Sequence, residues 1–212
     1  RAAGLKTVLD IVANHGAPAF SAPTDRPAFG RLYRDGVLVA NHQNLHPTGL
    51  DPANNPLHAW FLPTPDVAQL SNLDDANPEV LEYLVGAYSQ WIEQGADAFR
   101  IDTIRHVGHP FWKAFSDRIR AEHPGFYMFG EHFAYDADAI ATHTWPQNGG
   151  ISVLDFPMQE AMLTVFGEGY DRCSIDSIAS RAGCSRAGGR GRPQPHDNTP
   201  QARAPDVGER KR

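Results

Sequence analysis

Short apolar runs alternate with amphipathic stretches along most of the chain. Runs rich in β-branched and aromatic residues lie at 5–12, 98–102, 126–129 and 151–156, and each has the length of a single strand. Apolar residues recur at helical spacing over 80–92 and 111–119, and a further helix is expected from 159 to 166. Strands that alternate with helices are typical of βαβ units on a parallel sheet. The pattern therefore predicts an α/β fold.

The helix near residue 78 has clear signals at both ends. Asn77 is a good N-cap, Pro78 suits the first helical position, and Glu79 favours the positive end of the helix dipole. Gly95 follows the last apolar position of the helix and is a natural stop.

Residues 17–76 break this alternation. They are rich in Pro, Asn, Asp, His and Gly, with only short extended pieces such as 36–39. A segment of this length is far longer than an ordinary connection between a strand and a helix. We therefore expect residues 17–76 to form a small inserted domain within a fold made of residues 1–16 and 77–170.

The last 42 residues, 171–212, differ in composition from the rest. They hold nine of the 19 Lys and Arg residues but five of the 25 acids, so the tail carries +4 and the remainder −10. No hydrophobic period continues past Ile178, and Gly, Pro, Arg and Ala dominate. Such composition predicts disorder. The abrupt change also raises the hypothesis of a frameshifted tail.

Charge and apolar runs exclude some classes of partner. A formal charge of −6 gives no reason to expect nucleic-acid binding, and no apolar run reaches the length that spans a membrane. Cys173 and Cys184 both lie in the tail and do not fix a redox compartment.

Polar and charged residues mark the ends of the predicted strands. Asp10 to His15, Arg100 with Asp102, Glu131 and Asp155 all occupy such positions, where parallel α/β barrels carry their reactive groups. Because residues two apart on a strand share a face, Arg100 and Asp102 should point the same way. A guanidinium beside a carboxylate favours its ionised form, as a nucleophile requires.

Three segments resemble the signature motifs of the α-amylase family, glycoside hydrolase family 13, and they occur in that family's order. The first is Asp10-Ile11-Val12-Ala13-Asn14-His15, and the third is Phe129-Gly130-Glu131. The second is Gly95-Ala96-Asp97-Ala98-Phe99-Arg100-Ile101-Asp102-Thr103-Ile104-Arg105-His106. The insertion stands where the family carries its small B domain.

The resemblance implies a role for each matching residue. Asp102 would be the nucleophile and Glu131 the general acid and base of a retaining reaction on α-1,4-glucosidic bonds. Arg100 would orient Asp102, His15 and His106 would contact sugar, and Arg105 would lie among the substrate-binding residues. The expected partner is an α-glucan or maltooligosaccharide.

The insertion resembles the B domain of cyclodextrin glucanotransferases and related amylases, through residues 23–36 and Leu70-Ser71-Asn72-Leu73-Asp74. The family implies structural calcium, held by positions matching Asn14, Asn72 and His106. The family's acidic ligand is Asn72 here, a weaker neutral ligand. Ala68 replaces an aromatic residue that helps glucanotransferases to cyclise, which favours hydrolysis over cyclisation.

A complete (β/α)8 barrel has eight strands and about 250 residues. The four predicted strands match the third to sixth, so a partial barrel is expected, with two strands preceding Arg1 and two following Phe166. The family's third catalytic carboxylate, in an Asn-His-Asp motif, has no match, because His196-Asp197-Asn198 has another order. We therefore expect the chain alone to be unstable and to have little activity.

Four functional alternatives remain open from the sequence. They are a retaining α-glucan hydrolase, a glucanotransferase, a non-catalytic glucan-binding remnant, and a metal-dependent hydrolase that uses His15, His106 and Asp102. The last lacks a close pair of ligand histidines. A polymeric substrate would imply an exported full-length protein, although no signal segment is visible.

Overall fold

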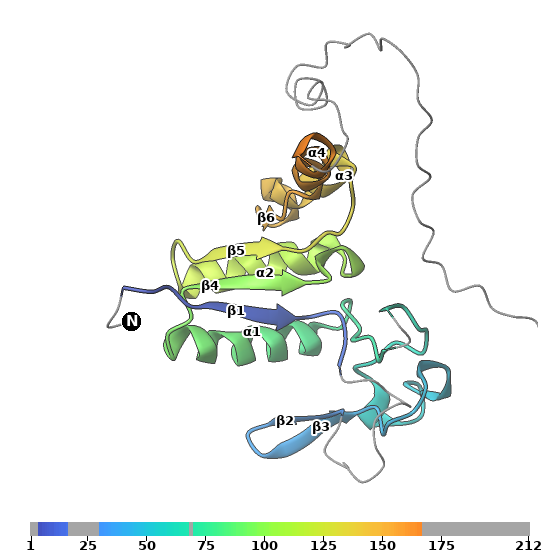
Figure 1. Cartoon of the computed structure of the whole chain (residues 1–212). Helices are drawn as coiled ribbons and strands as arrows, with labels where there is room; N and C mark the ends of the chain where they lie inside the picture. Colours follow the sequence, from blue (N-terminus) through green and yellow to red (C-terminus); the bar gives the residue numbers. More distant parts are fainter. Residues whose placement is uncertain (1–3, 17–29, 68–69, 167–212) are drawn as a thin grey trace, which may run out of the picture.

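The computed structural model describes residues 4–16, 30–67 and 70–166. Its centre is a parallel sheet of strands β1 (Val8–Val12), β4 (Ala98–Asp102), β5 (Tyr127–Gly130) and β6 (Ser152–Val153), in the order β1-β4-β5-β6. All three pairings are parallel, so the carboxyl ends of the strands lie at one edge (Figure 1). The predicted parallel α/β fold is confirmed.

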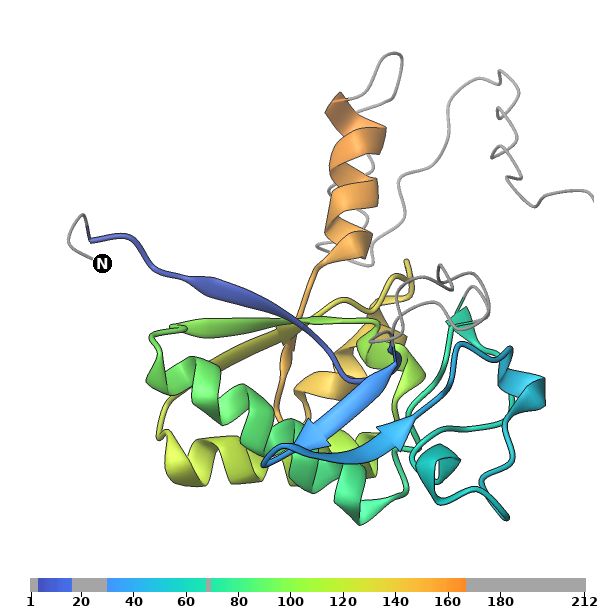
Figure 2. The same cartoon turned by 90° about the horizontal axis from the view of Figure 1, so that it is seen from below.

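Two helices cover one side of this sheet. Helix α1 (Pro78–Glu93) and helix α2 (His109–Glu122) lie next to each other there, while helix α4 (Phe156–Phe166) extends from the other side (Figure 2). The Asn77 side chain caps α1 by accepting from the Glu79 amide, as its sequence predicts. The core between sheet and helices contains the fully buried side chains Phe99, Ile101, Trp112, Phe115 and Ile119.

The inserted region begins after the carboxyl end of β1, returns beside the residues that follow this strand, and then leads into α1. It contains a hairpin of β2 (Arg31–Arg34) and β3 (Val37–Asn41), followed by short 3-10 turns at Pro47–Gly49 and Pro56–His58. Its returning strand-like segment pairs with the outgoing one, since the Gly16 amide donates to the Ser71 carbonyl at 2.9 Å and the Leu73 amide to the Asn14 carbonyl at 2.8 Å. This pairing fixes the inserted region beside the sheet edge.

Several expected elements differ in length or lie outside the described residues. The apolar run at 151–156 gives only the two-residue β6, whose Ser152 and Val153 lie opposite Phe129 and Gly130 of β5, and one further bond from the Leu154 amide to the Gly130 carbonyl ends the pairing. Helix α4 starts at Phe156 and not near Gln159. Helix α3 (Ala137–Ala141) was not expected from the pattern. The tail 171–212 with both cysteines, the motif at 23–29 and Ala68 lie outside the described residues.

Candidate active site

Arg100 brings the two candidate catalytic carboxylates together. Its Nη1 donates to Oδ1 of Asp102 at 3.0 Å, and its Nη2 lies 2.7 Å from Oε2 of Glu131. These side chains are a quarter to a third exposed, so solvent and ligands can reach them. Two carboxyl groups therefore lie on one guanidinium at the edge where the strands end.

The strand register explains this arrangement. Phe99 and Ile101 point into the core with no exposed surface, so Arg100 and Asp102 point to the opposite face of β4. Residue Gly130 on β5 lies opposite Ile101, and the Glu131 amide donates to the Ile101 carbonyl at 2.8 Å. This bond continues the parallel ladder by one residue and places Glu131 beside Asp102.

Gly130 is required by close packing just before Glu131. A Cβ atom at this position would lie 2.4 Å from Cδ1 of the buried residue Ile104. The 3-10 turn η4 (Ile104–His106) therefore packs directly on the backbone of β5. A glycine here allows β4, η4 and β5 to approach closely enough for Glu131 to reach Arg100.

A third carboxylate completes the charge cluster. Asp10 on β1 accepts from Arg100 Nη1 at 2.8 Å, but its side chain is 66% exposed. Burial opposes the charge of the guanidinium, yet its hydrogen bond to Asp10 and the neighbouring carboxylates outweigh that effect and raise the pKa of Arg100. Arg100 is thus a permanent cation that links β1, β4 and the residue after β5.

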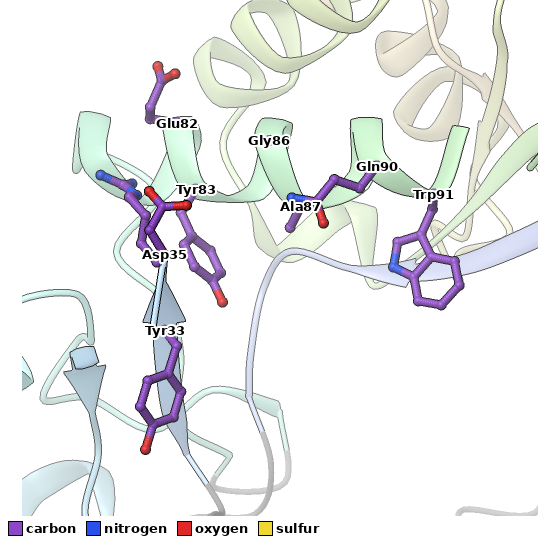
Figure 3. Close-up of a pocket in the computed structure, with 9 residues that line it drawn as sticks. Tyr33, Asp35, Glu82, Tyr83, Gly86, Ala87, Gln90 and Trp91 are labelled. Carbon is purple, nitrogen blue, oxygen red and sulfur yellow. The ribbon is translucent and has the colours of Figure 1, made fainter. Parts of the chain in front are cut away.

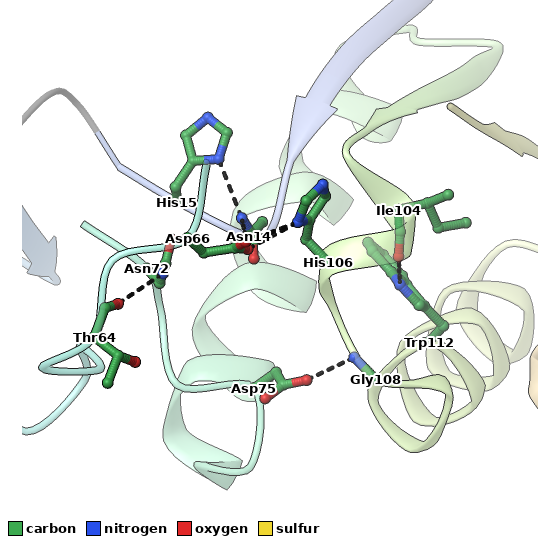
Figure 4. Close-up of polar contacts among 10 residues, drawn as sticks. All are labelled: Asn14, His15, Thr64, Asp66, Asn72, Asp75, Ile104, His106, Gly108 and Trp112. Atoms are coloured by element: carbon green, nitrogen blue, oxygen red, sulfur yellow. Dashed lines mark hydrogen bonds and ion pairs between the residues drawn. The ribbon is translucent and has the colours of Figure 1, made fainter. Parts of the chain in front are cut away.

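Figure 4 shows a second polar cluster at the same edge, where the sheet meets the inserted region. His106 Nδ1 lies 2.8 Å from Oδ2 of Asp66, and Asn14 Nδ2 donates to the same oxygen at 3.4 Å. His15 Nδ1 lies 3.4 Å from Asn14 Nδ2. The sequence-predicted residues Asn14, His15 and His106 therefore gather around Asp66.

His15 also lies close to the carboxylate cluster. Burial lowers the pKa of His15, and the charge of Asp102 opposes that effect. His15 is thus neutral near pH 7, and a neutral imidazole can both donate and accept a hydrogen bond. This property suits a group that binds a sugar hydroxyl.

Asp66 was not among the sequence-predicted site residues. It follows Pro63-Thr64-Pro65 in an irregular stretch of the inserted region, where periodicity carries no information. Its contacts with residues 40 and 52 positions away in sequence were not visible from any local pattern.

Arg105 was predicted to bind substrate, and in the structure its Nη1 donates to the Phe133 carbonyl at 3.1 Å.

The residues expected to hold calcium offer suitable oxygen atoms. Asn14 and Asn72 are each 3% exposed and lie on the paired segments at the base of the inserted region. Asn72 Nδ2 donates to the Thr64 carbonyl at 3.0 Å, whereas its buried Oδ1 has no hydrogen-bond partner among the described residues. Calcium prefers oxygen ligands, so His106 could contribute its main-chain carbonyl and not its ring. The described residues contain no cluster of three or more His, Cys, Asp or Glu side chains that could hold a metal.

A cavity of about 550 Å³ lies elsewhere, between the β2–β3 hairpin and α1 (Figure 3). Tyr33, Tyr83 and Trp91 line it together with polar groups such as Asp35 and Gln90. Neither candidate catalytic carboxylate lines this cavity.

Within the part of the chain that the structure describes, no helix is long and apolar enough to cross a membrane.

Comparison with known proteins identifies the family. The family model "Alpha amylase, catalytic domain" matches residues 1–181. Cyclomaltodextrin glucanotransferase from Niallia circulans is 30% identical over 84% of this chain and 25% of its own length. The enzyme of the same name from Klebsiella oxytoca is 30% identical over 76% of this chain and 26% of its own length. The chain thus spans about a quarter of the length of these curated relatives.

Solved structures support the same relationship. An α-amylase from Geobacillus thermoleovorans, crystallised with acarbose, aligns with a TM-score of 0.51 and 27% identity over 77% of this chain and 33% of its own. A cyclomaltodextrin glucanotransferase with a three-domain ABC distribution aligns with a TM-score of 0.61 and 27% identity over 82% and 36%. The four-stranded parallel sheet is consistent with part of the (β/α)8 barrel of these enzymes. The chain belongs to the α-amylase family and carries part of its catalytic domain.

Proposed function

We propose that this chain carries the two working carboxylates of a retaining α-glucan hydrolase. The observation that carries the proposal is the single guanidinium of Arg100, which contacts both Asp102 and Glu131 where the strands end. Retaining glycosidases need two carboxyl groups about 5–5.5 Å apart. Adjacent nitrogens of one guanidinium hold two carboxylates at close range, which supports this geometry.

The proposed reaction has two steps. The Asp102 carboxylate attacks the anomeric carbon and forms an ester, while protonated Glu131 gives its proton to the departing glycosidic oxygen. The Glu131 carboxylate then takes a proton from water, which attacks the same carbon and releases Asp102. Two inversions leave the anomeric configuration unchanged. His15 and His106, which lie near this centre, would bind sugar hydroxyls beside the cleaved bond.

A second candidate is transglycosylation, in which a sugar hydroxyl replaces water in the second step. The curated relatives from Niallia circulans and Klebsiella oxytoca are both named cyclomaltodextrin glucanotransferases, which supports this candidate. Ala68 favours hydrolysis, but it lies outside the described residues. Both candidates use the same first step, so the site geometry serves either one.

We also propose that calcium joins the sheet edge to the inserted region. Asn14 and Asn72 would supply side-chain oxygens and His106 a main-chain oxygen, with the unpartnered Oδ1 of Asn72 as the supporting observation. The ion would stabilise the junction of the two segments and would not take part in the chemical step. Its charge would also attract Asp66, which already contacts Asn14 and His106.

The test is incubation of the 212-residue chain with maltoheptaose, with products separated by chromatography and their anomers followed by ¹H NMR. Linear products of retained configuration support hydrolysis, and cyclic products support the transferase. Either activity should be weak, because the sequence has no match to the family's third catalytic carboxylate, and should be lost in Asp102→Asn and Glu131→Gln. Asp117→Asn is a matched control, because Asp117 is an exposed carboxylate on α2. Glucan binding without turnover would reject the catalytic proposal in favour of a glucan-binding remnant.

A further inference from the structure

Glu131, His132 and Phe133 follow β5, and each makes a polar contact with a different element. The Glu131 amide donates to the Ile101 carbonyl on β4, and the Phe133 carbonyl accepts from Arg105 on η4. Between them, His132 Nδ1 lies 3.0 Å from Nε2 of His143. The direction of the chain at Glu131 therefore depends on contacts on both of its sides.

His143 is the buried end of this histidine pair. It lies in the 3-10 turn η5 (Thr142–Thr144) and is 2% exposed. Its carbonyl accepts from the Ile151 amide at 2.9 Å, which ties η5 to the segment that enters β6. The ring also contacts His109, the first residue of α2, with 4.7 Å between ring centroids. The His132–His143 pair thus joins the segment after β5 to a buried part of the fold.

The proton positions in this pair follow from its hydrogen bonds. One imidazole nitrogen must donate and the other accept across the 3.0 Å contact. His143 Nδ1 is buried without a hydrogen-bond partner among the described residues. A buried N–H without an acceptor is costly, so His143 carries its proton on Nε2 and donates to His132 Nδ1.

Protonation of either ring leaves the same unsatisfied donor. Protonating His143 places a hydrogen on its Nδ1. Protonating His132 makes its Nδ1 a donor, so the His143 proton must move from Nε2 to Nδ1. In both cases the buried Nδ1 of His143 becomes an N–H without an acceptor. Protonation of either ring therefore destabilises the hydrogen-bonded arrangement that the two neutral rings form.

The surroundings of the pair act in the same direction. Burial lowers the pKa of His143 to about 4, and the charges of His109 and His132 contribute. Burial also lowers the pKa of His132, as do Arg105 and His106 on η4 and His109 on α2. The described residues offer no metal-holding cluster here that would use these rings as ligands.

We propose that His143, acting through His132, is a positioning residue for Glu131, and that protonation of this histidine pair releases its hold on the segment after β5. This inference rests on the proposed role of Glu131 as acid and base. It assigns an acid-sensitive element to the site that involves none of the carboxylates themselves.

The test uses NMR on the full chain with ¹⁵N-labelled histidine. A coupling between His132 Nδ1 and His143 Nε2 across the hydrogen bond is expected at pH 7 and should disappear on acidification toward pH 4. The amide resonances of Glu131 and His132 should move together with this loss. Absence of the coupling at pH 7 would overturn the proposal.

Two variants separate positioning from bulk packing. His143→Gln can still donate to His132 but cannot be protonated in this range, so it should keep the neutral amide positions and lose this part of the pH response. His143→Phe keeps a ring without a hydrogen bond, so it should show the acid positions already at pH 7. His123→Gln, at the other end of α2, is the control and should behave as the unmodified chain. An unchanged pH response in His143→Gln would overturn the proposal.

These readouts do not require turnover. If the chain cleaves no glucan but shows the coupling, and His143→Gln keeps the neutral amide positions, the positioning contact is confirmed and only the catalytic role is rejected. A chain that cleaves glucan without the coupling does the reverse.

Discussion

Replacing Arg100 by leucine removes the cation on which the proposed site is built. The guanidinium contacts Asp102 at 3.0 Å and Glu131 at 2.7 Å, both partly buried, and Asp10 at 2.8 Å. A hydrogen bond to a charged group contributes roughly 1.5–3 kcal/mol. The Asp10 contact adds little because that side chain is mostly exposed. Solvent also screens the contacts of Arg100 with Asp102 and Glu131. We therefore expect the unfolding free energy to fall by about 3 kcal/mol, near the low end of what these two hydrogen bonds contribute together.

Urea denaturation at pH 7 measures this loss. Double-mutant cycles of Arg100→Leu with Glu131→Gln and with Asp102→Asn isolate each pair. Arg118→Leu is the matched control, since Arg118 makes a two-pronged contact with Glu82 on the exposed surface, where solvent screening leaves such pairs little effect on stability. If Arg100→Leu lowers the unfolding free energy no more than Arg118→Leu does, the charge of Arg100 does not organise the two carboxylates.

Three further predictions test other parts of the structure. The unfolding free energy should fall as the pH drops from 6.5 toward 4, because unfolded His143 takes up a proton in this range and folded His143, with its pKa lowered to about 4, does not. Urea denaturation at several pH values should show a fall of at most about 3 kcal/mol in the unfolding free energy, and a pH-independent value would contradict the prediction. Gly130→Ala should cost about 1–3 kcal/mol by overpacking against Ile104, whereas Gly86→Ala, where an added Cβ meets nothing within 4 Å, should be neutral or stabilising; equal melting temperatures of the two variants would refute this. Calcium at 100 times its dissociation constant should stabilise the fold by about 2.7 kcal/mol, and the Asn72→Asp variant should bind calcium more tightly. A melting temperature that changes neither with added calcium nor with a chelator would reject the site.

Features governed by local rules were predictable from the sequence. Asn77, Pro78 and Glu79 begin a helix through capping and dipole effects that act within one turn, and α1 begins there. The pairing of Arg100 with Asp102 followed from the alternation of side chains along a strand, and the structure shows it. The order of motifs placed Glu131 at the next strand end, where it reaches the same guanidinium.

Features that depend on distant partners were not predictable. The apolar run at 151–156 suggested a longer strand, but only two of its residues pair with β5, and pairing is a property of both strands. Asp66 joins His106 and Asn14 from an irregular segment without periodicity. His143 is buried in a turn whose sequence shows no apolar pattern, and its importance becomes visible only through His132.

The contacts of Arg100 place opposite demands on the two proposed catalytic groups. An ion pair with a guanidinium is made by an ionised carboxylate, which suits Asp102 as a nucleophile. It does not suit Glu131 in the first step, where this residue must carry a proton to give to the leaving oxygen. Within the proposed mechanism, the observed contact therefore suits Glu131 in the second step, in which it would act as a base. Cleavage by the proposed mechanism requires the Arg100–Glu131 contact to open when glucan enters, while the Arg100–Asp102 contact can persist throughout.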